Sequence, residues 1–148
     1  MMQKQSIWNE GSPDPLRLTA LEQNSLSAHL GIEITAVGED SITARMKVDN
    51  RTLQPHGRLH GGASVALAET VGSLAANLVL DPATHVAVGL DVNANHIRPV
   101  KSGYVFATAT VESLGRTTQV WTIRIVDEQD RLVCLSRLTM AVIGIDKV

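Results

Sequence analysis

The residues best suited to chemistry lie between positions 54 and 73, where one carboxylate stands in an apolar run. Residues 60–80 hold a single charged side chain, Glu69, among alanine, valine and leucine residues. A carboxylate in apolar surroundings is costly unless it is paired or has a chemical task, so Glu69 is a candidate general base or nucleophile. A structural glutamate paired at a subunit interface is the alternative interpretation.

A possible oxyanion site precedes this carboxylate. The sequence His60-Gly61-Gly62 would begin the helix that carries Glu69. The first N–H groups of a helix have no acceptor within it and favour negative charge, and glycine lets a substrate approach the backbone closely. The Gly61 amide is therefore a candidate donor to a carbonyl oxygen, and the combination points to acyl chemistry. A flexible loop-to-helix junction is the plainer interpretation.

Three further polar residues are candidates for the site, although each also has an ordinary structural explanation. Gln54 can donate to a carbonyl oxygen, although its spacing alone fits an ordinary polar loop residue. Ser73 lies four residues after Glu69 on the same helix face, but a serine in a helix often bonds its own backbone. His96 falls in a strand, where a core histidine with a hydrogen-bond partner is the usual case.

Three arginines and a threonine, at strand ends or within strands, form a candidate phosphate-binding set. Guanidinium and hydroxyl groups bind phosphate well, with solvated surface charges as the alternative. The candidates are Arg98, Arg116, Thr117 and Arg137. The histidines lack metal-ligand spacing and there is no cysteine cluster, so no metal is expected. Neither a Walker motif nor a G-x-G-x-x-G motif is present.

The elements that position these residues follow from apolar periodicity. A long helix follows residue 60 and ends before Asp81-Pro82. Strands are expected at 32–37, 41–48, 85–97, 104–114, 117–126 and 132–143. In the strand 85–97, one face should hold Val86, Val88, Leu90, Val92, Ala94 and His96. Short connections favour antiparallel neighbours, so we expect an α+β fold with an antiparallel sheet wrapped around the helix.

The 148 residues predict one domain at 18–148, preceded by a loose arm at 1–17 in which Gly11, Pro13 and Pro15 oppose regular structure. Thr19 and Glu22 suggest a capping box that opens a short helix ending at Gly31.

Composition narrows the classes of partner. A net charge of −2 without a basic tract argues against nucleic acid. Polar residues interrupt the 63–80 run, and the start of the chain lacks a signal-peptide core, so no membrane segment is expected. The only cysteine, Cys134, falls in an apolar strand pattern. It is expected to be a buried, inert thiol in a cytoplasmic protein.

Four segments together carry a family resemblance. The string QPHGRLHGGASVALAETVGS at 54–73 resembles the hotdog-fold acyl-CoA thioesterases, and shorter matches are GLDVNANHIR at 89–98, GRTTQVW at 115–121 and CLSRLT at 134–139. The chain looks most like the branch that acts on aromatic thioesters such as 4-hydroxybenzoyl-CoA and 1,4-dihydroxy-2-naphthoyl-CoA. That branch includes the proofreading thioesterase of enterobactin synthesis.

The resemblance implies a thioesterase acting on an acyl-CoA or acyl-carrier-protein thioester, with coenzyme A as part of the substrate and no separate cofactor. It implies a homodimer or a dimer of dimers, a homotetramer, with active sites at the dimer interface. Glu69 would be nucleophile or base and Gly61 the oxyanion donor.

The remaining roles come from the same resemblance. His60 and Gln54 would orient the thioester and assist its reaction. Ser73 would hold the attacking water or the leaving product. His96 would line the acyl or pantetheine region, and the phosphate-binding set would meet the CoA nucleotide.

Two rival functions stay open at this point. A hotdog dehydratase would act on a 3-hydroxyacyl thioester through a His/Glu pair and form a double bond. A binding module would hold acyl-CoA without releasing thiol.

Overall fold

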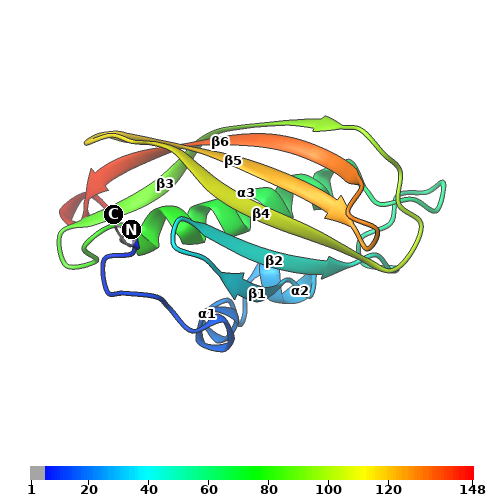
Figure 1. The fold of residues 1–148 in the computed structure, drawn as a ribbon, viewed down its shortest axis with the longest axis horizontal. Coiled ribbons are helices and arrows are strands. Elements are labelled where there is room, and N and C mark those ends of the chain that lie inside the picture. The colour runs from blue at the N-terminus through cyan, green and yellow to red at the C-terminus, as the bar shows by residue number, and fades with distance from the viewer. Residues whose placement is uncertain (1–5) are drawn as a thin grey trace, which may run out of the picture.

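A computed structural model describes residues 6–148 as one antiparallel sheet curved around a long helix (Figure 1). The sheet has six strands in the order β1-β2-β4-β5-β6-β3. They are β1 (Glu33–Val37), β2 (Ser41–Lys47), β3 (His85–His96), β4 (Tyr104–Leu114), β5 (Thr118–Asp127) and β6 (Leu132–Gly144). The helices are α1 (Pro15–Leu21), α2 (Leu26–His29) and α3 (Gly61–Leu78), with a short 3-10 turn, η1 (Ile145–Lys147). The predicted α+β architecture is confirmed.

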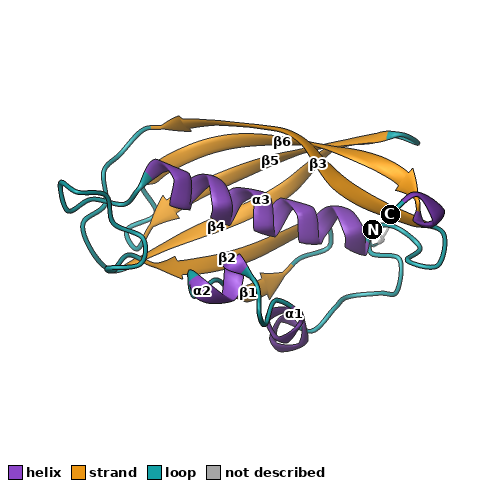
Figure 2. Cartoon of the chain, turned by 180° about the vertical axis from the view of Figure 1, so that it is seen from behind, coloured by secondary structure: helices purple, strands orange, loops and turns teal. Residues whose placement is uncertain are grey.

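The long helix α3 lies along the inner face of the sheet, as both views show (Figures 1 and 2). Its buried residues recur at helical spacing: Ala63, Ser64, Leu67, Ala68, Val71, Gly72, Ala75 and Ala76. Helix and sheet approach closely at Gly72, where an added Cβ would lie 2.6 Å from a methyl carbon of Leu138. The opposite face of α3, which includes Glu69, is left only partly covered by the rest of the chain.

Strand β3 departs from simple alternation. The pairing register of β3 with β6 shifts between Gly89 and Asp91, which makes a β-bulge at Leu90. Before the bulge Ala87 is buried and Gly89 faces Glu69, whereas after it His96 faces the start of α3. The expectation that Val86, Val88 and Leu90 share a face with His96 is therefore wrong, because one extra residue reverses the phase of the strand.

The N-terminal segment also differs from the sequence prediction. Residues 1–5 of the expected arm lie outside the described residues. In the described part Trp8 is 5% exposed, stacks on Trp121 at a centroid distance of 6.5 Å, and donates from its indole N–H to Gly38 O at 2.8 Å. This part of the arm is therefore packed against the domain.

The first helix begins earlier than expected. Asp14 is the N-cap of α1, its side chain accepts from the Leu16 N–H, and Pro15 occupies the first helical position. The helix ends at Leu21, so Glu22 is its C-cap and does not belong to a capping box. The chain then turns through Asn24, at φ 61°, into the separate helix α2.

Candidate active site

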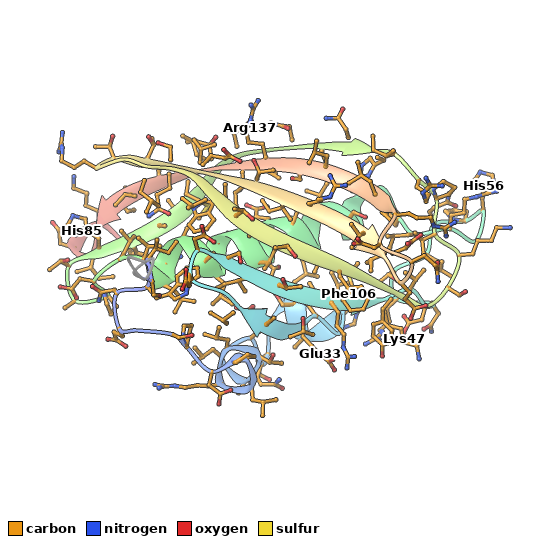
Figure 3. The ribbon with its side chains drawn as sticks, viewed as in Figure 1. Glu33, Lys47, His56, His85, Phe106 and Arg137 are labelled. Atoms are coloured by element: carbon orange, nitrogen blue, oxygen red, sulfur yellow. The ribbon has the colours of Figure 1, made fainter. Side chains whose placement is uncertain are left out.

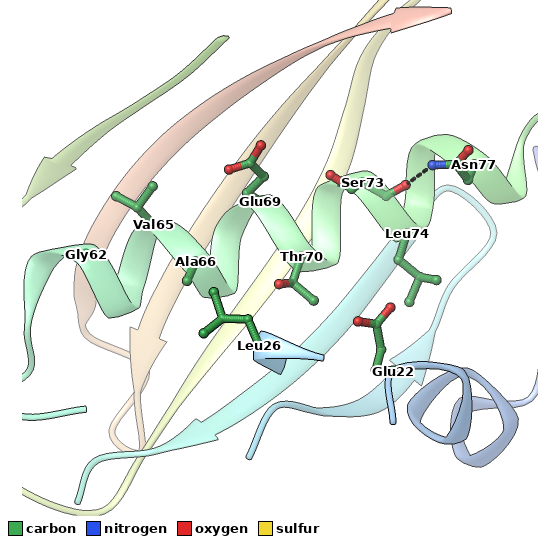
Figure 4. A pocket seen from close by; sticks show the side chains of 10 residues that line it. All are labelled: Glu22, Leu26, Gly62, Val65, Ala66, Glu69, Thr70, Ser73, Leu74 and Asn77. Atoms are coloured by element: carbon green, nitrogen blue, oxygen red, sulfur yellow. Dashed lines mark hydrogen bonds between the residues drawn. The ribbon is translucent and has the colours of Figure 1, made fainter. Parts of the chain in front are cut away.

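Glu69 borders a cavity on the exposed face of α3 (Figure 4). The cavity has a volume of about 560 Å³ and is lined by Glu22, Leu26, Gly62, Val65, Ala66, Glu69, Thr70, Ser73, Leu74 and Asn77. Glu69 and Ser73 lie one turn apart on this face, as the sequence predicts. The Ser73 hydroxyl has a weak contact, 3.8 Å, with the sulfur of Met140.

The Glu69 carboxyl packs against the backbone of β3. An added Cβ on Gly89 would overlap Glu69 Oε1, so the absence of a side chain at Gly89 makes room for the carboxyl. Within residues 6–148 Glu69 forms no salt bridge and accepts no hydrogen bond. A half-buried carboxylate without a protein partner, at the edge of a cavity, suits a chemical role better than a structural one.

The start of α3 leaves one amide free. His60 is the N-cap, and its Nδ1 accepts from the Gly62 N–H at 2.8 Å. The N–H groups of Ala63 and Ser64 donate to His60 O. Among the described residues no acceptor meets the Gly61 N–H. Of the first amides of α3, this one is therefore available to a ligand.

Gly61 lines a second cavity, of about 320 Å³. Its lining includes Gln54, Arg58, Leu59, Gly61, Ser64, His96, Ile97, Arg98, Pro99 and Val133. The His96 ring lies against Gly61, since a Cβ added there would be 2.9 Å from His96 Nε2. The Gln54 side-chain oxygen accepts from the His56 N–H, which leaves the Gln54 NH₂ group as a donor at the cavity.

The two cavities lie too far apart to form one site within a single chain. Gly61 and Glu69 are separated by about 12 Å along the helix axis, because α-helices rise about 1.5 Å per residue. The Gly61 N–H also points away from the body of the helix. For attack, the carboxylate oxygen and the carbonyl carbon must lie about 3–3.5 Å apart. A glutamate side chain is too short to bring Glu69 that close to a carbonyl group held at Gly61 of the same chain.

The structure groups only one of the four proposed phosphate-binding residues with the second cavity. Arg98 lines it together with Arg58. Arg116 and Thr117 lie in the turn between β4 and β5, and Arg137 stands on the outer side of the sheet (Figure 3). None of these three lines either cavity, so their role in binding the CoA nucleotide stays a prediction.

Several lining residues were not singled out by the sequence. Arg58 lies within the motif string but resembles an ordinary loop charge. Glu22 is hidden by its apparent place in a capping box, and Leu26 by its place on the expected helix. In the described part of the chain no cluster of three His, Cys, Asp or Glu side chains is arranged to hold a metal. No helix there has the length and apolarity needed to cross a membrane.

Comparison with known proteins identifies the family. Residues 56–134 match the profile of the thioesterase superfamily. A Haemophilus influenzae thioesterase is 55% identical, with a TM-score of 0.89 over 93% of this chain and 95% of that one. A Pseudomonas aeruginosa thioesterase, solved with one glutamine replaced by alanine, is 48% identical, with a TM-score of 0.92 over 95% and 100%.

A more distant relative comes from Staphylococcus aureus. This thioesterase is 36% identical, with a TM-score of 0.77 over 79% of this chain and 97% of that one. It has been solved with a glutamine replaced by alanine and, separately, with a glutamate replaced by alanine. The match to the family profile and the two closer relatives show that the chain belongs to the thioesterase superfamily, as a thioester hydrolase with the hotdog fold.

Proposed function

We propose that the chain hydrolyses acyl thioesters of coenzyme A or of a carrier protein, with an aromatic acyl group, at a site shared by two copies. One copy supplies the Gly61 amide and Gln54, and the other supplies Glu69. A single observation carries the proposal: Gly61 and Glu69, each without a partner among the described residues, border different cavities of one chain.

A second copy can join along the edge strand β3. No strand of the described chain pairs with the outer edge of β3. At Ala87 the backbone N–H and C=O of this strand bond the Asn77 carboxamide, which also donates to Ser73 O. Val88 and Leu90 of this strand are 38% and 64% exposed. A long edge strand with exposed apolar side chains favours pairing, and a two-fold dimer would place each α3 beside its copy. Homodimer or dimer of dimers, and a cytoplasmic location, belong to this proposal.

The chemistry follows from the two groups. The Gly61 N–H donates to the thioester oxygen as negative charge develops there, with help from the Gln54 NH₂ group. Glu69 either attacks the carbonyl carbon and expels the thiolate, giving an anhydride that water cleaves, or takes a proton from an attacking water. Either route yields a carboxylic acid and a free thiol and regenerates the Glu69 carboxylate.

Variants of a relative support the choice of residues. In the Staphylococcus aureus thioesterase the replaced glutamine and the replaced glutamate lie fifteen positions apart, the same separation as Gln54 and Glu69. His60 has a structural task as the N-cap, so a direct catalytic part is not needed to explain its presence.

Release of thiol from benzoyl-CoA tests the proposal. We expect Glu69→Gln to lose at least about a hundredfold in kcat while its melting temperature stays close to that of the wild type, because the amide is neither base nor nucleophile. Glu112→Gln, at an exposed position in β4, removes the same charge and should leave the rate unchanged.

The assay also separates the rival functions. A dehydratase would leave benzoyl-CoA unchanged, because that thioester has no 3-hydroxyl group to eliminate, and would form an ultraviolet-absorbing double bond from a 3-hydroxyacyl-CoA without releasing thiol. A binding module would saturate with benzoyl-CoA without turnover. Cys134 will not obscure the result, because it is buried and burial raises the pKa of its thiol. Full activity in Glu69→Gln would contradict the proposal.

A further inference from the structure

The cavity that holds Glu69 contains a second carboxylate. Its lining includes Glu22 and Glu69 and no arginine, lysine or histidine. The two side chains flank the exposed face of α3, and the Glu22 carboxyl points toward the helix between Thr70 and Leu74 (Figure 4). The other lining residues are uncharged, so within this chain these two groups carry the whole charge of the cavity lining.

Glu22 is held in place by contacts on both sides of it in the sequence. In α1, the Thr19 hydroxyl accepts from the Ile34 N–H at 2.9 Å and fixes the helix to β1. In α2, the hydroxyls of Ser27 and Thr70 share a hydrogen bond of 3.2 Å, which fixes this helix to α3. Glu22 lies between these two attachments, so its backbone is anchored on both sides, and it lines the cavity.

No group of the described chain neutralises this carboxylate. Glu22 forms no salt bridge within residues 6–148, and its side chain accepts no hydrogen bond there. It is half-buried, so water screens it less than it screens the fully exposed glutamates of the surface. Within one chain, a negative charge entering the cavity would therefore meet two like charges that no cation of that chain compensates.

We propose that Glu22 is a specificity-determining residue that excludes acyl groups ending in a carboxylate and admits neutral or cationic ones. This inference rests on the proposed function, which places the acyl group in the cavity beside Glu69. The electrostatic repulsion acts only against substrates with an anionic acyl group. Glu22 therefore sets specificity without taking part in the reaction. Glu69 contributes to the same exclusion but is required for chemistry, which leaves Glu22 as the residue whose charge can be changed.

Three thioesters of nearly equal shape test this inference. They are 4-methylbenzoyl-CoA, 4-carboxybenzoyl-CoA and 4-(aminomethyl)benzoyl-CoA, whose rigid ring carries a neutral, an anionic or a cationic group at the same depth. For the wild type we expect a kcat/KM for the anionic substrate at least about tenfold below that for the neutral one. Glu22→Gln should raise the anionic-to-neutral ratio about tenfold, and Glu22→Lys should place the anionic substrate above the cationic one.

Controls separate this inference from a general effect of charge or folding. Glu112→Gln makes the same change of net charge outside the cavity and should leave the ratio as in the wild type. Melting temperatures of the Glu22 variants check that they fold. A wild type that hydrolyses the anionic and neutral substrates equally, or a Glu22→Gln variant with an unchanged ratio, would overturn the role of Glu22.

Failure of the proposed function gives a different result. If no substrate released thiol, that proposal would fall, and equilibrium binding of the three thioesters would still test the charge exclusion. Tighter binding of the anionic thioester to Glu22→Gln than to the wild type would support it. Equal binding of that thioester to both proteins would overturn it.

Discussion

Consecutive amides at the start of α3 have different partners, and that difference defines the site at the scale of single residues. His60 donates to Thr52 O, Gly62 to His60 Nδ1, and Ala63 to His60 O, while Gly61 has no acceptor among the described residues. Glu69 is the corresponding unpaired acceptor. An acyl-transfer site requires a free donor and a free acceptor near the same carbonyl group, which in the proposed site would come from two copies of α3.

A substitution at Gly61 tests the role of its amide. In Gly61→Ala the new Cβ would lie 2.9 Å from His96 Nε2 and would crowd the side from which a carbonyl approaches. We expect kcat/KM for thioester hydrolysis to fall at least about tenfold. Thermal unfolding should show no loss of stability, because alanine is favoured over glycine in a helix. His96→Ala is the control, because it shows how much activity is lost when the His96 imidazole alone is removed. A fully active Gly61→Ala would argue against the Gly61 amide as donor.

The candidate residues with the strongest chemical signal are predictable from the sequence. Glu69 is conspicuous because it is the only charge in an apolar helix, and Gly61 because it stands at the start of that helix. Glu22 is not predictable, because Thr19 and Glu22 have the spacing of a capping box. The alternative signal was Asp14-Pro15, an N-cap followed by proline at the first helical position, which is typical of a helix start.

At the scale of elements, the bulge in β3 decides which residues face α3. Alternation locates the strand closely but gives a wrong face for its first half, since one extra residue at Leu90 carries no compositional signal. The bulge allows Gly89 to face Glu69 and His96 to face Gly61 from the same strand. Bulges often direct residues toward active sites in this way.

Gly89→Ala tests this arrangement of β3 and α3. The added methyl group would displace the Glu69 carboxyl, so we expect a fall in kcat of about tenfold or more with a smaller change in KM. In a Glu69→Gln background the same substitution should cost little more, because residues acting as one unit are not additive. Independent, multiplying losses in the double variant would show that Gly89 acts elsewhere.

At the scale of the whole molecule, strand positions and the central helix are predictable because each has a distinct apolar period. The apolar period does not predict that the candidate residues are divided between two cavities. That division depends on the cavity that Gly61 and Glu69 each border in the folded chain. Sequence similarity to the thioesterase superfamily supplies the reaction, whereas the aromatic branch suggested by the 54–73 string remains a prediction. The unpaired edge of β3 is where a second copy would complete the site.

Complementation between two variants, each impaired in a group from a different half of the site, tests the shared site most directly. Glu69→Ala and Gln54→Ala are each purified, mixed, unfolded and refolded together, and assayed for thiol release from benzoyl-CoA. Random pairing should restore about a quarter of wild-type activity, because half of the dimers then contain one intact site of two. A mixture no more active than its separate components would contradict a site built from Gly61 and Gln54 of one copy and Glu69 of the other.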